Sequence, residues 1–409
     1  MRPSEAQILF VVISLIAFAL DFGNAALFNV MNYGAVGDGK HDDAKAFVEA
    51  WKAVCEFGGV MYVPEGRNFL LSPVNFQGPC NSTFIHIMVS APSSLLSRWM
   101  RIFFLKLNSW VQISGNVMAP NDKGAWKGCT EDTWLYFSNI KGLMVYGSGK
   151  INANGELWWE NNALQFVRCD GLNLNGLTHL NSPRNHIGIH RSNNVNISQL
   201  RIIAPKDSPN TDGIDVSCST NVTISRSIIQ TGDDCIAINN GSSDIRIMGI
   251  SCGPGHGISV GSLGRDGSYA AVERIFVTNC NFFGSQNGVR IKTWQGGSGY
   301  ARDIHFKNIT LKDVKNPIII DQFYCIDQNH CEDQPSAVEV SHVSYEAVYG
   351  SSANEKAIQL SCSKSKPCTN IQMFKINIIS AIHGEKAYAT CNNAKGIESL
   401  IVPRVPCLS

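Results

Sequence analysis

The segment Asn210–Val260, NTDGIDVSCSTNVTISRSIIQTGDDCIAINNGSSDIRIMGISCGPGHGISV, decides the fold because it contains the same short apolar pair three times. The pairs are Ile214/Val216, Ile236/Ile238 and Ile258/Val260, and their first members are spaced 22 residues apart. Apolar residues that alternate with other residues predict strands with one buried face. The even spacing indicates that the same structural unit returns once per interval.

The pattern continues on both sides of this segment. The flanking pairs are Ile187/Ile189, Val289/Ile291 and Ile318/Ile320, at intervals of 27, 31 and 29 residues. Loose repeats of this length, with Gly, Asn and Ser between short strands, predict a solenoid in which each coil covers its neighbour. We therefore expect an all-β, single-domain, right-handed parallel β-helix, the handedness following from the twist of L-residue strands. The alternative is a β-sandwich or propeller with irregular strands.

A helix is expected at the N-terminal end of the solenoid. The segment Asp42–Cys55 carries apolar residues at helical spacing behind an aspartate cap. The bare strand edges at the end of a β-helix would otherwise invite association. We predict that this helix covers them.

Four charged motifs fall in register with the repeat: Asn210–Asp212, Gly232–Asp234, Gly255–Gly257 and Arg290–Lys292. Asp212, Asp234 and His256 each lie two residues before their apolar pair, which predicts a column of three side chains on strands about 4.8 Å apart. Asp233 should point differently. Arg290 and Lys292 alternate with apolar residues and should project outward from the next coil. Residues of these types are also common in turns and on solvent-exposed strands. Like charges at one edge of a sheet repel one another and lower stability, so their presence together favours a functional role.

The four motifs together resemble the signature blocks of plant polygalacturonases, glycoside hydrolase family 28. The blocks are Ser208–Gly213, Gly232–Cys235, Cys252–Ser259 and Arg290–Thr293, and the resemblance extends over nearly the whole mature chain, from Tyr33 to the C-terminal cysteines. It implies a right-handed parallel β-helix that hydrolyses α-1,4 bonds between galacturonic acid units of pectin with inversion.

The resemblance implies a role for each candidate residue. Asp233 would be the general acid, Asp212 and Asp234 would hold and deprotonate the water, and His256 would tune the protonation of the acid. Crowded carboxyl groups raise at least one pKa, which suits a reaction that needs one protonated and one ionised carboxyl. Arg290 and Lys292 are expected to bind a galacturonate carboxylate, because a guanidinium fork and an ammonium both suit that group. Tyr324 resembles the active-site tyrosine of the family.

Charge indicates local recognition of the substrate. The chain has 34 Lys plus Arg and 33 Asp plus Glu, so no overall field attracts the pectin polyanion. We find no metal-ligand spacing of Cys and His, no phosphate loop and no basic cluster for nucleic acid. We therefore expect no cofactor and no metal, a homogalacturonan substrate as the only partner, and a monomer.

The termini and cysteines predict export. Residues 1–26 have the apolar run of a signal peptide, too short to span a bilayer, and residues 27–409 form the enzyme domain. The expected location is the cell wall, without stable membrane association. Fourteen cysteines in an exported chain predict disulfides. The candidate pairs are Cys235/Cys252, Cys325/Cys331, Cys362/Cys368 and Cys391/Cys407, and the sequons that suit a glycoprotein are Asn81, Asn196, Asn221, Asn240 and Asn308.

Residues 90–113 depart from the family pattern. This apolar and basic insert lacks the Gly and Asn turns of an extra coil. We expect it to loop out of the stack, so that a deletion joining Val89 to Ser114 would improve solubility.

Three other functions are considered. A rhamnogalacturonan hydrolase would be expected to alter Arg290 and Lys292, and a catalytically impaired wall-binding protein would be expected to lose a charged motif. A calcium-dependent pectate lyase would need a metal-binding acid set and a basic proton abstractor. The choice between endo and exo cleavage depends on loops that close the groove.

Overall fold

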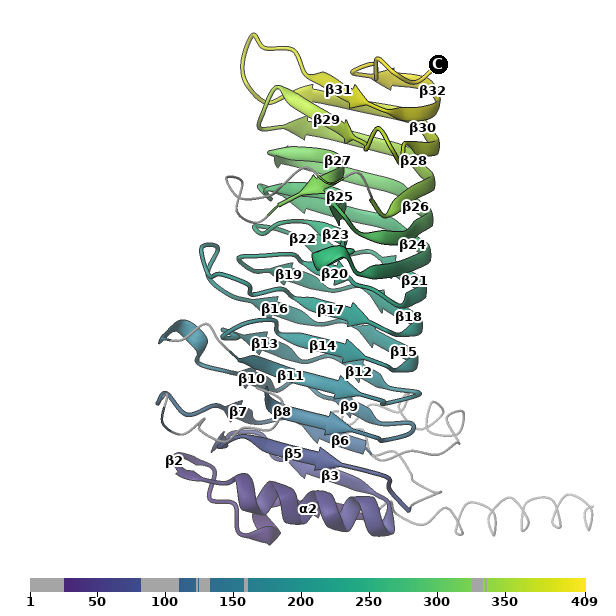
Figure 1. The fold of residues 1–409 in the computed structure, drawn as a ribbon. Helices are drawn as coiled ribbons and strands as arrows, with labels where there is room; N and C mark the ends of the chain where they lie inside the picture. The colour runs from purple at the N-terminus through teal and green to yellow at the C-terminus, as the bar shows by residue number, and fades with distance from the viewer. Residues whose placement is uncertain are drawn as a thin grey trace, which may run out of the picture.

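The computed structural model describes residues 26–81, 110–122, 124, 133–157, 161–325, 334 and 337–409. In this part of the chain the strands stack coil on coil from the N-terminal helix to the C-terminus (Figure 1). Every pairing between named strands is parallel, as each coil returns in the same direction as the last. The predicted all-β parallel β-helix is confirmed.

One face of the solenoid is a sheet to which each coil gives one strand. Within the described residues it has 11 strands, and it carries the active-site motifs at its edge. In spatial order the strands are β5 (Val74–Gln77), β8 (Thr133–Ser138), β11 (Asn162–Val167), β14 (Ile187–His190), β17 (Ile214–Ser217), β20 (Ile236–Ile238), β23 (Ile258–Leu263), β25 (Asn287–Trp294), β27 (Asn316–Tyr324), β29 (Lys356–Ser361) and β31 (Tyr388–Asn392).

The remaining strands form two further faces that join into one sheet of 21 strands among the described residues. The faces merge where the long strand β24 pairs with both β21 and β22. The strands are β1 (Leu27–Asn29), β2 (Asp38–Asp42), β3 (Val60–Val63), β4 (Asn68–Leu70), β6 (Trp110–Ile113), β7 (Asn116–Met118), β9 (Met144–Tyr146), β10 (Lys150–Asn152), β12 (Asn173–Asn175), β13 (Thr178–Leu180), β15 (Asn193–Ser198), β16 (Arg201–Ile203), β18 (Thr220–Ser225), β19 (Ile228–Gln230), β21 (Ser242–Met248), β22 (Ser251–Cys252), β24 (Tyr269–Phe283), β26 (Ser298–Val314), β28 (Glu339–Ser352), β30 (Cys368–Ser380) and β32 (Ala394–Val402). Short 3-10 turns occupy Val30–Tyr33, Gly155–Leu157 and Arg265–Gly267.

The core is built from the apolar pairs that the sequence pattern identified. Ile214 pairs with Ile187 on one side and with Ile236 on the other, and the ladder continues through Ile258 and Val289. These side chains are fully buried. Their shared register places the residues that precede each pair at one edge of the sheet.

Helix α2 (Ala44–Phe57) lies at the N-terminal end of the stack, as predicted (Figure 1). Its buried face includes Phe47, Ala50 and Trp51. Trp51 packs edge-on against the ring of Phe76, 5.6 Å away, in the first coil. The helix begins two residues later than expected, and the Asp42 carboxylate accepts a hydrogen bond from the Ala44 amide at 3.0 Å. The helix therefore covers the open end of the core.

The prediction for the insert 90–113 was wrong at its C-terminal end. Residues 110–113 form β6, which pairs with β3 and β9 inside the stack. Val111 and Ile113 are buried in the core. Pairing in register with both neighbours and burial of residues 111–113 make this strand part of the native β-helix. Joining Val89 to Ser114 would remove it, whereas residues 90–109 lie outside the described part of the chain.

Three predicted disulfides are confirmed: Cys235–Cys252, Cys362–Cys368 and Cys391–Cys407. A fourth bond, Cys55–Cys80, joins the end of α2 to the first coil and was not predicted. Its members are 25 residues apart, so neither proximity in sequence nor the repeat register pointed to it. The partner expected for Cys325, Cys331, lies outside the described residues.

The expected signal peptide also lies outside the described residues, apart from Ala26. In the described part of the chain, no helix has the length and apolar character needed to cross a membrane.

Candidate active site

An open groove of about 860 Å³ runs across the 11-stranded sheet at the edge where the motifs lie. It is lined by residues of six consecutive strands, β17 to β29, and by turns that precede the strands, beginning with the turn before β14. All seven predicted site residues line it: Asp212, Asp233, Asp234, His256, Arg290, Lys292 and Tyr324. The repeat register therefore brings together the residues that it was expected to bring together.

The turns that carry the acids are held by small residues. The Thr211 hydroxyl is buried, lies 2.6 Å from the Ser208 hydroxyl and accepts a hydrogen bond from the Gly232 amide at 3.0 Å. This ties the turn before β17 to the turn before β20. Gly257 has φ +89°, and a Cβ there would lie 2.3 Å from the Gly288 carbonyl oxygen. Only glycine fits a positive φ at that approach.

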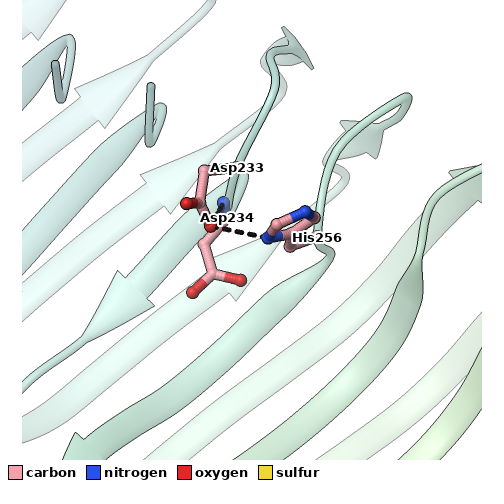
Figure 2. Close-up of side chains that lie close together, drawn as sticks. All are labelled: Asp233, Asp234 and His256. Atoms are coloured by element: carbon pink, nitrogen blue, oxygen red, sulfur yellow. Dashed lines mark hydrogen bonds and ion pairs between the residues drawn. The ribbon is translucent and has the colours of Figure 1, made fainter. Parts of the chain in front are cut away.

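Asp233 and His256 form a hydrogen-bonded pair at the groove surface (Figure 2). His256 Nδ1 lies 2.8 Å from Asp233 Oδ1, and the two side chains are 32% and 23% exposed. The same oxygen accepts a hydrogen bond from the Asp234 amide at 2.8 Å. The bond from His256 lowers the pKa of Asp233, although burial of the carboxyl opposes this effect. Asp233 is thus an accessible carboxyl whose proton affinity depends on His256.

Asp234 turns away from this pair into the sheet, and its side chain is only 1% exposed. Its Oδ1 accepts hydrogen bonds from Ser259 Oγ and Arg290 Nη2, both at 2.8 Å. Its Oδ2 accepts one from Lys292 Nζ at 2.8 Å. Two cationic donors therefore offset the charge of a carboxylate that is removed from water.

The prediction of one column of side chains was partly wrong. The backbone register is as expected, because Ile214, Ile236 and Ile258 are aligned in neighbouring strands. The side chain of His256 nevertheless bonds Asp233 and not Asp234. Strand pleating no longer fixes the direction of side chains in the turns. Asp233 therefore points toward solvent, whereas Asp234 points toward the core.

Arg290 and Lys292 were expected to project from the groove wall toward the substrate. Their side chains line the groove but are only 11% and 10% exposed, and both are ion-paired with Asp234. Lys292 Nζ also lies 5.2 Å from the centroid of the Tyr324 ring, within cation–π range. The two cations therefore connect Asp234 to the groove.

Asp212 has a neighbour that the sequence prediction missed. Asp215 lies in β17 between the buried Ile214 and Val216, so its side chain faces the groove, which it lines. Burial raises the pKa of Asp212 well above its usual range and raises that of Asp215 to about 7, and the nearby carboxylates add to both effects. Period-2 alternation could have identified Asp215, since the same rule identified Arg290 and Lys292.

Asp321 also lines the groove and was not predicted as a site residue. It follows the apolar pair Ile318/Ile320 in β27 and pairs in register with Lys292. Burial raises the pKa of its carboxyl. Its Oδ1 accepts a hydrogen bond from the Phe323 amide at 3.0 Å, so Asp321 is held in place by its own strand.

A metal ion could in principle be bound by Asp233, Asp234 and His256. Each of the three residues offers one ligand atom, and these atoms lie within 4.8 Å of one another. Both oxygens of Asp234 already accept hydrogen bonds from cationic donors, which would repel a metal ion. The donor set therefore does not fit a metal site. It fits proton transfer between carboxyl groups of different surroundings.

An open groove that holds an accessible carboxyl next to a buried, charge-compensated one supplies the acid and the carboxylate that a glycoside hydrolase needs. Residues 60–402 match the sequence pattern of glycosyl hydrolases family 28, and the chain belongs to this family. It is 48% identical to a probable polygalacturonase of Arabidopsis thaliana over 95% of this chain and 82% of the relative. It is 40% identical to a polygalacturonase of Malus domestica over 93% of this chain and 79% of that one.

Solved structures share the fold. An endo-xylogalacturonan hydrolase from Aspergillus tubingensis superposes with a TM-score of 0.75 at 23% identity, covering 90% of this chain and 96% of that one. A polygalacturonase from Erwinia carotovora superposes with a TM-score of 0.68 at 18% identity, covering 91% and 96%. At these identities the likeness establishes the architecture and not the substrate.

Proposed function

We propose that this chain is a polygalacturonase that hydrolyses α-1,4-galacturonosidic bonds of pectin. One observation carries the proposal: Asp212, Asp233 and Asp234 converge in a single open groove that also holds Arg290 and Lys292. The carboxyl groups supply an acid and a base, and the cations suit a substrate that bears one carboxylate per sugar. The identity to polygalacturonases over most of the chain supports this choice of substrate.

In the proposed mechanism Asp233 is the general acid. Its side chain is 23% exposed, and its carboxyl lies in the groove next to His256. In the free enzyme His256 lowers the pKa of Asp233. A bound galacturonate would exclude water and add negative charge, and both changes raise the pKa of a carboxyl. Substrate binding would thereby favour the protonated form that gives its proton to the leaving oxygen.

Asp212 and Asp234 would hold and deprotonate the attacking water from the other side of the sugar. Asp234 is suited to hold it as a fixed negative group, because Arg290 and Lys292 compensate its charge. Asp212 is suited to accept the proton, because burial and its acidic neighbours raise its pKa and hence its basicity. Direct attack by this water gives inversion, the stereochemistry that the family resemblance implies.

Arg290 and Lys292 would bind the carboxylate of the sugar at the cleavage site. Each uses one donor for Asp234 at 2.8 Å and retains further N–H groups, since a guanidinium has five donors and an ammonium three. Tyr324 would offer its ring to a sugar face near Lys292. Recognition and base positioning would then depend on the same two cations.

We further propose that the enzyme is secreted into the cell wall as a monomer, with residues 1–26 as its signal peptide. The disulfides of the described residues suit an oxidising compartment. The five sequon asparagines are all exposed, as glycosylation requires. Residues 27–409 would form one enzyme domain.

Action on rhamnogalacturonan is the alternative within this fold, and a catalytically impaired wall-binding protein is the alternative without catalysis. The first is disfavoured because Arg290 and Lys292 both line the groove, and the second because every charged motif reaches it.

The deciding experiment is to size the products that the purified chain releases from polygalacturonate, with fully methyl-esterified pectin and rhamnogalacturonan as parallel substrates. We expect saturated galacturonate oligomers or monomers from polygalacturonate and little from the other two. The sizes separate endo from exo action. Equal rates on all three substrates, or unsaturated products that require a chelatable metal, would reject the proposal.

A further inference from the structure

A second hollow, of about 320 Å³, opens off the groove at the edge of the sheet opposite to the acids. The acids lie in turns before β17 and β20, whereas Trp294 and Tyr324 are the last residues of β25 and β27. Because these strands are parallel, their first and last residues lie at opposite edges of the sheet. We call this hollow the side pocket, and its lining among the described residues is Asp266, Gly267, Trp294, Gln295, Gly296, Tyr324 and Gln334.

The side pocket is continuous with the groove, because Gln295 and Tyr324 line both of them. The centroid of the Tyr324 ring lies 5.2 Å from Lys292 Nζ. The same ring meets the Trp294 ring edge-on, with the two centroids 5.3 Å apart. A group in the side pocket would therefore lie next to a sugar whose carboxylate is bound by Lys292.

The turn after β23 forms a preformed wall of the side pocket. Gly264 in this turn has φ +78°, and a Cβ there would lie 2.7 Å from Val338 Cγ2 and 2.9 Å from Gly297 Cα. The turn is thus packed closely against later coils. Asp266 has a positive φ of 55°, which aspartate and asparagine tolerate better than most side chains. Sites for small groups are usually preformed in this way.

Trp294 gives the side pocket an aromatic surface. Its side chain is half-buried, and its Nε1 is sealed from solvent with no hydrogen-bond partner among the described residues. The indole therefore offers the pocket apolar carbon surface and not a hydrogen bond. The Arg265 guanidinium carbon lies 5.4 Å from the centroid of the Trp294 ring, so Arg265 and Tyr324 together hold the ring in place.

The charge of the side pocket differs from that of the groove. Its lining among the described residues has one carboxylate, Asp266, and no lysine or arginine, whereas cations line the groove. The nearby Arg265 has its Nε 3.7 Å from Asp266 Oδ2, so the two charges offset each other. The amides of Gln295 and Gln334 add hydrogen-bond donors and acceptors. This lining suits a neutral group with hydroxyls and an apolar face, and it is unsuited to another uronate.

We propose that the side pocket binds a single neutral sugar that is carried as a branch on the galacturonan main chain. This inference rests on the proposed function, in which Arg290 and Lys292 hold the main chain in the groove. The groove crosses the strands and the side pocket lies at their ends, so a branch can enter it while the main chain keeps its path. The C–H face of the branch sugar packs on Trp294, and its hydroxyls bond to Asp266 and the Gln295 amide.

The test compares kcat/KM of the full chain on linear polygalacturonate and on galacturonan that carries single xylose branches. The measured quantity is the ratio of the branched to the linear substrate. We expect the wild type to cleave both at similar rates and to release oligomers with a branch at the new chain end. Trp294→Ala should lower the ratio roughly tenfold, because the aromatic surface is lost. Trp294→Phe keeps a ring, so its ratio should lie between those of Trp294→Ala and the wild type.

Asp266→Asn is a second variant that should fold, because the Asp266 side chain is 89% exposed and asparagine tolerates the same positive φ. It weakens one acceptor for the branch hydroxyls and should lower the ratio roughly threefold.

Phe276→Ala is the matched control. The Arg246 guanidinium carbon lies 5.9 Å from the centroid of the Phe276 ring, as Arg265 lies near Trp294, but Phe276 is in β24 of the 21-stranded sheet. Its ratio should equal that of the wild type. A wild type that cleaves only the linear substrate would overturn the inference. So would an unchanged ratio in folded Trp294→Ala, since an equal loss on both substrates would make the side pocket a site for the main chain.

A second readout separates this inference from the proposed function. Saturation-transfer NMR on the full chain carrying Asp233→Asn, with a xylose-branched trigalacturonate, should show transfer from the protein to the xylose protons. Adding Trp294→Ala should abolish it. This measurement needs no turnover. If the wild type cleaves neither substrate but the transfer is seen, the proposed function falls and the side pocket stands. If the wild type cleaves linear polygalacturonate and no transfer to xylose is seen, the proposed function stands and the side pocket falls.

Discussion

At the residue scale, three carboxyl groups in one groove differ because their hydrogen-bond partners differ. Asp233 is paired with His256 at the surface, whereas Asp234 is buried against Arg290 and Lys292. Asp212 is next to Asp215, and burial raises the pKa of both. Environment, and not residue type, lowers the pKa of Asp233 and raises that of Asp212.

Asp233→Asn should lower kcat on polygalacturonate by roughly a hundredfold to ten-thousandfold, because it removes the proposed proton donor without changing the size of the side chain. The thermal midpoint should change little, since the side chain is partly exposed. Steady-state kinetics and a melting curve measure both. Near-normal turnover in the folded variant would remove Asp233 from the role of acid.

His256 gives the same site a dependence on pH. The histidine bond lowers the pKa of Asp233, so the acid is lost as pH rises, while the raised pKa of Asp212 means that the base is lost as pH falls. We expect a bell-shaped profile of kcat/KM with its optimum on the acidic side of neutrality. Because Asp233 has the lower pKa of the two groups, it sets the limb of the profile at lower pH. In His256→Gln this acidic limb should move to higher pH, because Asp233 loses a partner that stabilises its ionised form. A limb that stays in place would argue against coupling between the two residues.

Lys292→Met should lower kcat/KM on polygalacturonate by roughly a hundredfold and reduce the preference for polygalacturonate over its methyl ester. The variant loses a cation for the substrate and one of two cations bonded to Asp234. Lys292→Arg should retain part of both functions. Lys307→Met is the control, because Lys307 forms an exposed ion pair with Glu346 at 2.9 Å and should affect neither rate nor preference.

At the element scale, one disulfide ties two active-site turns together. Cys235 follows Asp234 directly, and its partner Cys252 ends β22 four residues before His256. Both sulfurs are buried. The bond therefore holds the turn that carries Asp233 against the turn that carries His256, where strand pairing has not yet begun.

Replacing Cys235 and Cys252 together by Ala should lower the free energy of unfolding by about 2–4 kcal/mol and also lower the activity of the protein that remains folded. Cys391 and Cys407 provide the matched control, since they close a loop of 16 residues against 17 and lie at the C-terminal end. Their replacement should cost stability and leave activity per folded molecule unchanged. Denaturant titration and kinetics separate the two effects. If replacing either cysteine pair lowered activity equally, the Cys235–Cys252 bond would have no positioning role in the active site.

At the scale of the whole molecule, the solenoid core contains two buried histidines that must stay neutral. His179 is 1% exposed, and neither of its ring nitrogens is bonded within the described residues. Burial lowers its pKa to about 3, and burial together with His179 lowers that of His186 well below its usual range. The unfolded chain can protonate both rings near pH 6.5.

Stability should therefore be complete above about pH 6.5 and should fall as pH decreases, by up to about 1.4 kcal/mol per pH unit for each histidine. His179→Ile should flatten this dependence, because Ile151 and Ile202 are its neighbours in register and its ring makes no hydrogen bond among the described residues. Melting temperatures at about pH 7 and about pH 4.5 measure the effect. The control is His383→Gln, because His383 is exposed. An equal acid loss in His179→Ile and the wild type would contradict the mechanism.

The sequence by itself determined Tyr324 through the family resemblance, and it determined the repeat, the parallel β-helix, the capping helix and the other six residues at the groove through their pattern. These follow from periodicity, because an alternation of apolar residues at regular intervals fixes which positions share an edge. Three of the disulfides also followed, since their cysteines lie close together in sequence or in equivalent places of neighbouring coils.

Only the tertiary structure decided which of those residues touch. The bond of His256 to Asp233 depends on side-chain rotation in turns, where no period applies. The burial of Arg290 and Lys292 against Asp234 depends on a partner from another coil. The place of residues 110–113 in the stack and the Cys55–Cys80 bond depend on contacts between segments far apart in the chain. The register of the strands follows from the local sequence pattern. The partner of a charged side chain depends instead on which residues folding brings next to it.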